Sequence, residues 1–236
     1  MQKKLIERAA AMGLSLTDAQ ADSFAKYHEM LIEANRQMNL TRVADDPDEA
    51  VDRNYLDCVT PLTTSLFDNC RRAADVGSGA GFPGIPLAIL LPDVEFTLLD
   101  ALDKRVKFLN EVIDNLHLNA KAVHLRAEEA GRNPALRDSF DVATSRAVAS
   151  LNVLCEFSLP LVRPGGRMIA YKGPAWEEER DSAANALEKL NGRFVKAWSA
   201  SVPGRDWNHV LVEIEKTAAT PETYPRRSGM PEKRPL

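Results

Sequence analysis

Cysteine and histidine are scarce in this sequence, with three and four among 236 residues. The cysteines, Cys58, Cys70 and Cys155, are widely spaced and include no Cys-x-x-Cys pair, so we expect reduced thiols in a reducing compartment. No cluster of His, Asp and Glu with the spacing of a metal site is evident either, and we predict no metal. These absences leave the chemistry of the protein to other residue types.

Long apolar runs and an excess of positive charge are also missing. No such run follows the N-terminal residues Met1–Leu5, so we expect no signal peptide and no membrane partner, and a cytoplasmic protein. The net charge of −4 and the pI of about 5.7 argue against indiscriminate binding to nucleic acid but allow a local basic patch. With 44% hydrophobic residues, the chain can bury one good core, and we expect one α/β domain with an extension.

The first region, residues 1–69, is predicted to be a helical extension. Thr17 followed by Gln20 is the capping-box pattern of a helix start. Apolar residues then recur at spacings of three and four, as on one face of an amphipathic helix: Phe24, Tyr27, Leu31, Ala34 and Met38. Acidic residues are frequent between Asp45 and Asp57, which favours a solvated helix face over a nucleic-acid surface.

From Ala73 onwards, the pattern alternates between strands and helices. The expected strands are Ala73–Val76, Val94–Asp100, Ala122–Leu125, Phe140–Ser145 and Arg167–Lys172. The expected helices are Gly84–Leu91, Lys104–Leu118, Leu151–Val162 and Trp176–Leu190. Repeated β-α units of this kind predict a parallel, doubly wound sheet that binds ligands beyond the carboxyl ends of its strands.

The end of the pattern differs, because Phe194–Ser201 and Val210–Glu215 are separated by Pro203-Gly204 and by no helix. This hairpin-like pair would add an antiparallel strand at the sheet edge. The predicted fold class is therefore α/β, a doubly wound, mostly parallel seven-stranded sheet with an N-terminal helical extension. We expect three parts: the extension (1–69), the sheet domain (70–216) and a basic, Pro-rich tail (217–236) in an extended conformation.

A glycine-rich loop follows the first expected strand and has the sequence Asp75-Val76-Gly77-Ser78-Gly79-Ala80-Gly81-Phe82-Pro83-Gly84. Glycines let the backbone turn sharply and approach a ligand closely, and a helix that starts after such a turn offers unpaired N–H groups. The segment therefore predicts the floor of a nucleotide-like cofactor site. The spacing from Gly79 to Gly84 also fits the Gly-x-Gly-x-x-Gly dinucleotide fingerprint, with Asp100 as its ribose ligand.

Three features favour S-adenosylmethionine over a nicotinamide dinucleotide. Asp75 lies at the end of the first strand, where its carboxylate would face the methionine end of the cofactor. Asp100 ends the second strand, where one carboxylate can accept from two ribose hydroxyls. The terminal strand pair is typical of methyltransferase sheets. We therefore expect Asp75, Gly77, Gly79 and Asp100 to contact S-adenosylmethionine.

Two later strand ends complete the predicted site. Ala127 and Glu128 follow the third strand, where the adenine should lie, although Glu128 could equally be an exposed acid at a helix start. Arg146 follows the fourth strand, where groups face both methyl donor and acceptor. Its guanidinium stays protonated and cannot act as a base, so we expect it to position the reactants. An acceptor such as guanine N7, which has a lone pair and loses no proton, suits that site.

The sequence resembles the bacterial small-subunit rRNA methyltransferase G family, also called glucose-inhibited division protein B. The stretch from Asp75 to Ile89 carries most of the resemblance, and other segments follow in the order typical of the family: Asn39-Leu40-Thr41, Leu56-Asp57, Leu99-Asp100, Lys104-Arg105-Val106, Ser145-Arg146-Ala147, Lys172-Gly173 and Tyr224–Pro231. The resemblance implies a Rossmann-like class I methyltransferase that uses S-adenosylmethionine to methylate N7 of one guanine in the 16S rRNA of the 30S subunit.

The resemblance also implies cofactor contacts at Gly77, Phe82, Ala127, Glu128 and Arg146. Three residues depart from what is common in the family: Asn54 in place of histidine, Asp103 in place of glycine and Asn208 in place of arginine. The last two weaken the case for RNA binding at those positions and leave the cofactor site unaffected.

Contacts with RNA must come from local charge, because the whole chain is acidic. We expect phosphate contacts from basic residues of the tail, of one helix start and of the fifth strand end: Arg226, Arg227, Lys233, Arg234, Lys104, Arg105 and Lys172. A solvated helix face explains Lys104 and Arg105 equally well. Two other functions remain open, a nicotinamide-dependent oxidoreductase and a non-catalytic ribosome-assembly factor with a vestigial pocket. Nothing in the sequence demands more than a monomer.

Overall fold

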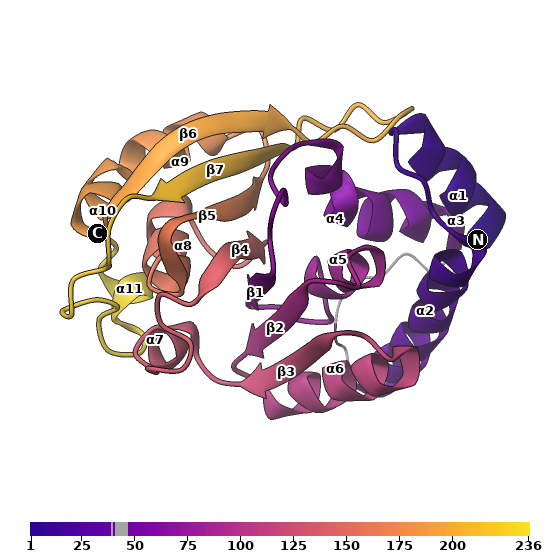
Figure 1. Ribbon diagram of the computed structural model, residues 1–236, viewed down its shortest axis with the longest axis horizontal. Helices are drawn as coiled ribbons and strands as arrows, with labels where there is room; N and C mark the ends of the chain where they lie inside the picture. Colours follow the sequence, from indigo (N-terminus) through magenta and orange to yellow (C-terminus); the bar gives the residue numbers. More distant parts are fainter. Residues whose placement is uncertain (39, 41–46) are drawn as a thin grey trace.

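The computed structural model describes residues 1–38, 40 and 47–236. The strands are β1 (Arg72–Val76), β2 (Glu95–Asp100), β3 (Ala120–His124), β4 (Phe140–Arg146), β5 (Val162–Lys172), β6 (Gly192–Ser199) and β7 (Val210–Lys216). Within the described residues they form one sheet, in the order β3-β2-β1-β4-β5-β7-β6 (Figure 1). β1 to β5 are parallel, and β7 lies antiparallel between β5 and β6. The predicted fold class is confirmed.

Helices cover both faces of the sheet. Before β1 come α1 (Gln2–Ala11), α2 (Asp18–Met38), α3 (Pro47–Ala50), a π-helix η1 (Val51–Leu56), α4 (Asp57–Val59) and a 3-10 helix η2 (Thr60–Thr63). The others are α5 (Gly84–Leu90), α6 (Asp103–Leu116), α7 (Ala127–Ala130), α8 (Leu151–Ser158), α9 (Trp176–Ser182), α10 (Ala184–Lys189) and α11 (Met230–Lys233). None of the described helices is both long and apolar enough to cross a membrane.

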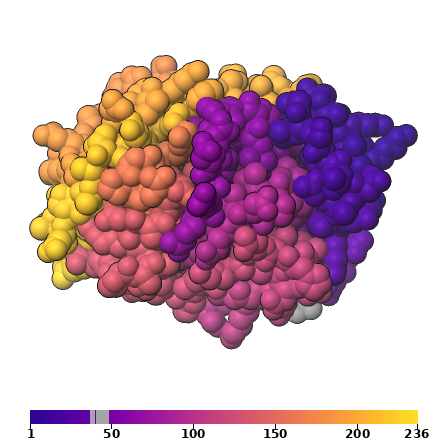
Figure 2. Space-filling view, viewed as in Figure 1, coloured from indigo at the N-terminus to yellow at the C-terminus, as the bar shows by residue number. Residues whose placement is uncertain are grey.

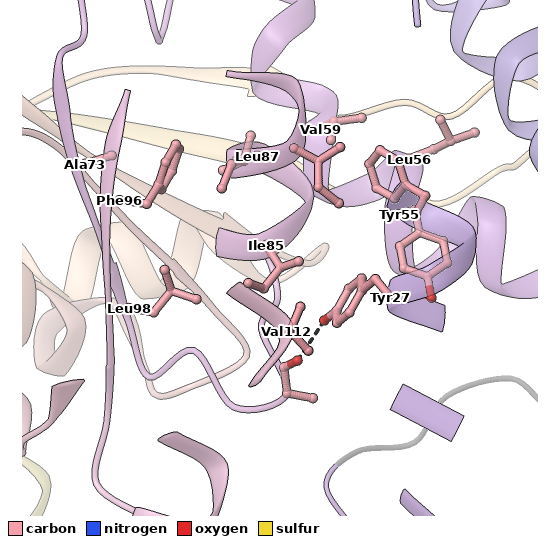
Figure 3. Packing of buried hydrophobic residues seen from close by; sticks show 14 of the residues in the cluster. Tyr27, Tyr55, Leu56, Val59, Ala73, Ile85, Leu87, Phe96, Leu98 and Val112 are labelled. Atoms are coloured by element: carbon pink, nitrogen blue, oxygen red, sulfur yellow. Dashed lines mark hydrogen bonds between the residues drawn. The ribbon is translucent and has the colours of Figure 1, made fainter. Parts of the chain in front are cut away.

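Alternate side chains along β1 and β2 enter two separate cores, as the two-residue period of a strand requires. Ala73 and Phe96 pack on one face with α5, α6 and the N-terminal helices, while Ala74 and Leu99 pack on the other with α8 and α10. Figure 3 shows the first core, in which Tyr27 of α2 lies close to Ile85 of α5. The N-terminal helices therefore share a core with the sheet.

The start of α2 follows the prediction. The Thr17 main-chain N–H donates to Gln20 Oε1 at 3.0 Å, and the Gln20 N–H donates to Thr17 Oγ1 at 3.2 Å, which is the reciprocal capping box. Asn39 and Thr41 of the family-like segment, and the side chain of Met38, lie outside the described residues.

The acidic run before β1 differs in part from its prediction. Its first acids, up to the side chain of residue 48, lie outside the described residues. Glu49 is exposed as expected, whereas Asp52 and Asp57 are buried rather than solvated. The Asp52 carboxylate is ion-paired with Arg8 and with Arg205, whose Nε lies 2.9 Å from Oδ2. Buried carboxylates need such partners. Here the arginines come from α1 and from the segment between β6 and β7, and local sequence gives no sign of them.

Two predicted helices are shorter than expected. The helix expected to reach Val162 ends at Ser158, because the carbonyl of Leu161 accepts from the N–H groups of Ser139 and Phe140 and so joins the sheet. The helix expected over Trp176–Leu190 is divided between α9 and α10 at Ala183, whose ψ of −2° leaves the α-helical range.

The extended tail is a wrong prediction. The tail instead folds back through turns and α11, against α7 and α8 (Figure 1). Arg137 Nη1 donates to the carbonyl of Tyr224 at 2.9 Å, and Arg132 Nε donates to that of Pro225 at 2.8 Å. Carbonyls of the proline-rich tail thus find donors in the segment that follows α7, and the basic tail is held by other basic residues of the chain.

Candidate active site

The glycine loop after β1 is fixed to the end of β2. The N–H groups of Gly77 and Ser78 both donate to the carbonyl of Leu99, at 2.9 and 3.0 Å. Gly77 has a φ of +74°, and a Cβ there would lie 2.6 Å from a methyl group of Val148. Gly79 has a φ of +59°, and its N–H donates to Asp100 Oδ2 at 2.8 Å. Both positions favour glycine because side chains disfavour this left-handed backbone, and at Gly77 a Cβ would also clash.

Asp75 lies beneath this loop and is fully buried. Its Oδ2 accepts from the N–H of Gly84 at 3.1 Å, and its Oδ1 accepts from the hydroxyl of Thr144 at 3.2 Å. Burial raises the pKa of this carboxyl to about 6. These contacts assign Asp75 to holding the loop, and its side chain is not among those that line the cavities described below.

The loop opens onto a cavity of about 940 Å³, here called the loop cavity, beyond the carboxyl ends of β1, β2 and β4. It contains five of the residues predicted to bind the cofactor: Gly77, Gly79, Phe82, Asp100 and Arg146. Asp100 also accepts from the N–H of Leu102 at 2.9 Å and lies 3.4 Å from Arg105 Nη1. The cavity is where ligands bind in doubly wound sheets.

A smaller space of about 120 Å³, the α7 pocket, continues from Asp100 toward α7. Ala127 and Glu128, the residues predicted to border the adenine, both line it. Glu128 is buried, and its Oε1 accepts from the N–H of Gly229 in the tail at 2.7 Å. Glu232 of α11 also lines this pocket. The tail is therefore part of the predicted adenine end of the site, which sequence reasoning missed.

Arg146, at the end of β4, is surrounded by residues from before β1. Its Nη1 donates to Cys58 Sγ at 2.7 Å, its Nη2 donates to the carbonyl of Arg53 at 3.0 Å, and Nη2 lies 3.3 Å from Asp57 Oδ2. Burial acts to lower the pKa of Arg146, but Cys58 and Asp57 reverse this and raise it overall. The guanidinium lies 5.9 Å from the centre of the Phe82 ring. Arg146 is thus a fixed cation.

A third space of about 350 Å³, the β5 pocket, lies beyond β4, β5 and the start of β7. Arg146 and Ala147 line both this pocket and the loop cavity. Asp57 and His209 also line it, with His209 Nδ1 at 3.0 Å from Asp57 Oδ1. Two ligand-sized spaces therefore meet at Arg146.

The predicted RNA-binding residues fall into two groups. Lys104, Arg227, Lys233 and Arg234 are exposed. The other three are half-buried and ion-paired: Arg105 with Asp100, Lys172 with Glu179 at 2.6 Å, and Arg226 with the buried Glu156 at 2.6 Å. Lys172 lines the β5 pocket, so it stays beside the candidate site.

Several residues of the N-terminal region reach the site without having been predicted, and two of them make notable contacts there. The hydroxyl of Tyr27 donates to the carbonyl of Ala80 in the glycine loop at 2.7 Å (Figure 3), and Asp57 lies beside Arg146. The segment Leu56-Asp57 belongs to the family resemblance and could have marked Asp57. Tyr27 has no such signal, because it is one of several apolar residues on a helical stripe.

The arrangement fits a nucleoside cofactor. Left-handed glycines place backbone against the loop cavity, and a Cβ at Gly77 would have no room. Asp100 lies where the loop cavity and the α7 pocket meet, as a ribose ligand should. In the described part of the chain, His, Cys, Asp and Glu nowhere gather in threes that could hold a metal ion.

Sequence comparisons agree with this arrangement. The family model described as rRNA small subunit methyltransferase G matches residues 20–204. A Clostridium perfringens (strain 13) protein named Ribosomal RNA small subunit methyltransferase G is 42% identical over 227 residues, which are 96% of this chain and 95% of that protein. The protein of the same name from Acetivibrio thermocellus is 44% identical over 237 residues, covering 100% and 97%.

Solved structures show a similar fold. Cofactor-bound Rv0187 from MTB gives a TM-score of 0.56 at 16% identity, and the match covers 83% of this chain and 90% of that chain. Aeropyrum pernix fibrillarin with natively bound S-adenosyl-L-methionine gives 0.51 at 10% identity, covering 67% and 72%. These chains share the fold of the sheet and its helices with this chain.

Proposed function

The chain belongs to the rRNA small subunit methyltransferase G family, and from this premise we propose that it methylates N7 of one guanine in the 16S rRNA of the 30S subunit, with S-adenosylmethionine as methyl donor. The observation that carries the proposal is the position of Arg146. It lines both the loop cavity and the β5 pocket, so donor and acceptor can meet at one fixed guanidinium.

The residues that would hold the cofactor follow from the cavities. Gly77, Gly79 and Phe82 would lie along its length in the loop cavity, Asp100 would accept from its ribose, and Ala127 with Glu128 would border its adenine in the α7 pocket. Asp75 would act indirectly, by holding the loop through Gly84 and Thr144. S-adenosylmethionine supplies the methyl group, bound to a positively charged sulfur.

The acceptor chemistry suits the side chains that border the site. Guanine N7 has a lone pair and no proton, so its attack requires no base. As the C–N bond forms, the electron pair of the C–S bond stays on sulfur, and positive charge passes to the purine ring. Arg146 remains protonated throughout. Its role is to align the two reactants and to provide a fixed charge around the shifting one.

RNA would reach the site through exposed cations. Arg227, Lys233 and Arg234 of the tail and Lys104 at the start of α6 have exposed side chains and would contact phosphates. Arg226 and Arg105 are ion-paired to buried carboxylates, and we assign them to holding the site. We further propose that the protein acts as a monomer in the cytoplasm.

The test is transfer of a labelled methyl group from S-adenosylmethionine to purified 30S subunits that lack the mark, with naked 16S rRNA in parallel. We expect incorporation of one methyl group per subunit, at N7 of a single guanine located by chemical cleavage of the modified strand. The salt dependence of RNA binding measures the phosphate contacts.

Other results would support the alternatives. S-adenosylmethionine binding without methyl transfer, together with 30S binding that ignores the cofactor, would indicate an assembly factor. Binding of NAD with no affinity for S-adenosylmethionine would indicate an oxidoreductase. Either result would overturn the proposal.

A further inference from the structure

We propose that the β5 pocket receives the target guanine and that Asp57 selects it through the Watson–Crick edge of the base. This inference rests on the proposed function and adds the residue that recognises the acceptor. The pocket volume of about 350 Å³ lies within the range of ligand pockets, about 300–1,000 Å³, and the pocket shares Arg146 and Ala147 with the loop cavity. A base bound there would adjoin the methyl donor.

Asp57 has hydrogen-bonding capacity left for a ligand. Its side chain is 4% exposed and lines the β5 pocket. Each of its oxygens has one described partner, His209 Nδ1 at 3.0 Å from Oδ1 and Arg146 Nη2 at 3.3 Å from Oδ2. Because a carboxylate offers about four lone-pair sites, about two remain to accept from a base.

Guanine presents the donors that such a carboxylate needs. Its N1–H and N2–H lie side by side on the Watson–Crick edge, whereas adenine has an acceptor at N1. A site built to accept two hydrogen bonds rejects a ligand that cannot give them, because its buried polar atoms are left unpaired. N7 is on another edge of the base, so this binding mode leaves it open to methylation.

The charge of Asp57 also suits the product. Methylation at N7 gives the purine a positive charge while sulfur loses one, and no proton moves. A carboxylate held in a largely buried position attracts that charge as it develops. Arg146 and His209 fix its orientation, so no rearrangement is needed at the moment of transfer.

One residue between the loop cavity and the β5 pocket has an unusual backbone conformation. Ala147, which lines both, has a φ of +56°, a left-handed conformation that is unfavourable for a non-glycine residue. Strain of this kind is concentrated at binding and catalytic sites. On the β5 side, the Tyr171 hydroxyl donates to the carbonyl of Cys58 at 2.5 Å and holds Asp57's neighbour in place.

The experiment compares Asp57→Asn with Asp52→Asn as a matched control. Asp52 lies five positions earlier, is similarly buried and is paired with two arginines, but it does not line the cavities described above. Ligand-observed NMR measures binding of GMP, IMP and AMP to each protein in the presence of S-adenosylhomocysteine. Methyl transfer to 30S subunits gives kcat, and thermal melting gives the folded fraction.

For the wild type we expect binding to weaken in the order GMP, IMP, AMP, since IMP lacks only the N2 donor. Asp57→Asn should reduce GMP binding about 10-fold, toward that of AMP, and kcat about 100-fold, with unchanged affinity for S-adenosylhomocysteine. Asp52→Asn should lower the melting temperature and keep both the nucleotide order and kcat per folded molecule. His209→Gln, a change at a half-exposed ring, should weaken GMP binding less than Asp57→Asn.

The inference is overturned if folded Asp57→Asn keeps the preference for GMP and wild-type kcat, or if both aspartate variants lose activity only in proportion to their folded fraction. Should Asp57→Asn fail to fold, His209→Gln provides the test in its place, and GMP binding as tight as that of the wild type in this variant would contradict the inference. If the wild-type protein transfers no methyl group to 30S subunits, the proposed function itself fails, which is a different result.

Discussion

The N-terminal region, residues 1–69, and the C-terminal tail, residues 217–236, extend to opposite ends of the molecule (Figures 1 and 2), yet both reach the carboxyl edge of the sheet. The N-terminal region supplies Arg53 and Asn54 to the loop cavity and Asp57 to the β5 pocket. The tail supplies Glu232 to the α7 pocket and the N–H that Glu128 accepts. The N-terminal region thus adjoins the proposed acceptor, and the tail adjoins the proposed adenine end of the cofactor site.

The burial of charged side chains in the two segments differs from what the net charge of each segment suggests. Two carboxylates of the acidic region, Asp52 and Asp57, lie inside the protein against arginines. The basic tail uses Arg226 to bind the buried Glu156 through main chain and side chain. Lys216, where the tail begins, is buried as well and donates to Asp138 and Thr220. The net charge of a segment therefore does not tell which of its charges reach solvent, because pairing with distant residues decides that.

Arg146→Ala is the change with the largest expected effect on the acceptor side. Arg146 contacts Arg53, Asp57 and Cys58, all from the N-terminal region, so its loss should disorganise the β5 pocket and leave Asp57 without its main countercharge. We expect kcat to fall at least about 1,000-fold, or about 4 kcal/mol, in a methyl-transfer assay, with cofactor affinity reduced far less.

Arg163→Ala is the matched control for that loss. Arg163, near the start of β5, is likewise paired with an aspartate, since its Nε lies 2.7 Å from Oδ1 of Asp141 in the neighbouring strand β4. This pair lies at the opposite edge of the sheet. The activity of Arg163→Ala should stay near that of the wild type. Near-full turnover of Arg146→Ala would show that the arginine is peripheral.

The sheet domain was predictable because its signals are local. Strand periodicity, the glycine loop and the strand-end acid Asp100 each depend on neighbours in sequence, and the structure places them where the pattern indicated. Tyr27, Asp57 and Arg226 were missed or misassigned because their roles depend on partners 53, 152 and 70 positions away. Contacts at that separation leave no period in the sequence.

Glu156→Gln tests the tail side of the comparison. Glu156 is 1% exposed and accepts from the main chain and guanidinium of Arg226. Removing its charge should destabilise the fold by about 3 kcal/mol and release the tail from Glu128. We expect the affinity for S-adenosylmethionine, measured by calorimetry, to fall about 10-fold, while binding of 16S rRNA changes little.

Arg227→Ala should give the opposite result. The side chain of Arg227 is exposed, so its loss should weaken RNA binding and reduce its salt dependence by about one phosphate contact, with cofactor affinity unchanged. If Glu156→Gln and Arg227→Ala both altered RNA binding alone, the tail would bind RNA and have no part in the cofactor site. The contrast between the N-terminal region and the tail would then disappear.

Asp75→Asn has the smallest expected effect. It concerns the glycine loop after β1, on which the N-terminal region and the tail converge. Burial raises the pKa of this carboxyl from 3.8 to about 6, so the native state retains a proton that the unfolded chain loses. Between these pH values the native state binds more protons, and the free energy of unfolding must fall as pH rises. Asp75 should thus cost about 1 kcal/mol of stability between pH 5 and pH 7.

An asparagine carries no charge and should not show that loss. We therefore expect the free energy of unfolding of Asp75→Asn relative to the wild type, measured in urea, to be about 1 kcal/mol higher at pH 7 than at pH 5. A difference that does not vary with pH would show that the wild-type carboxylate is already ionised at pH 5, stabilised by the N–H of Gly84 and the hydroxyl of Thr144.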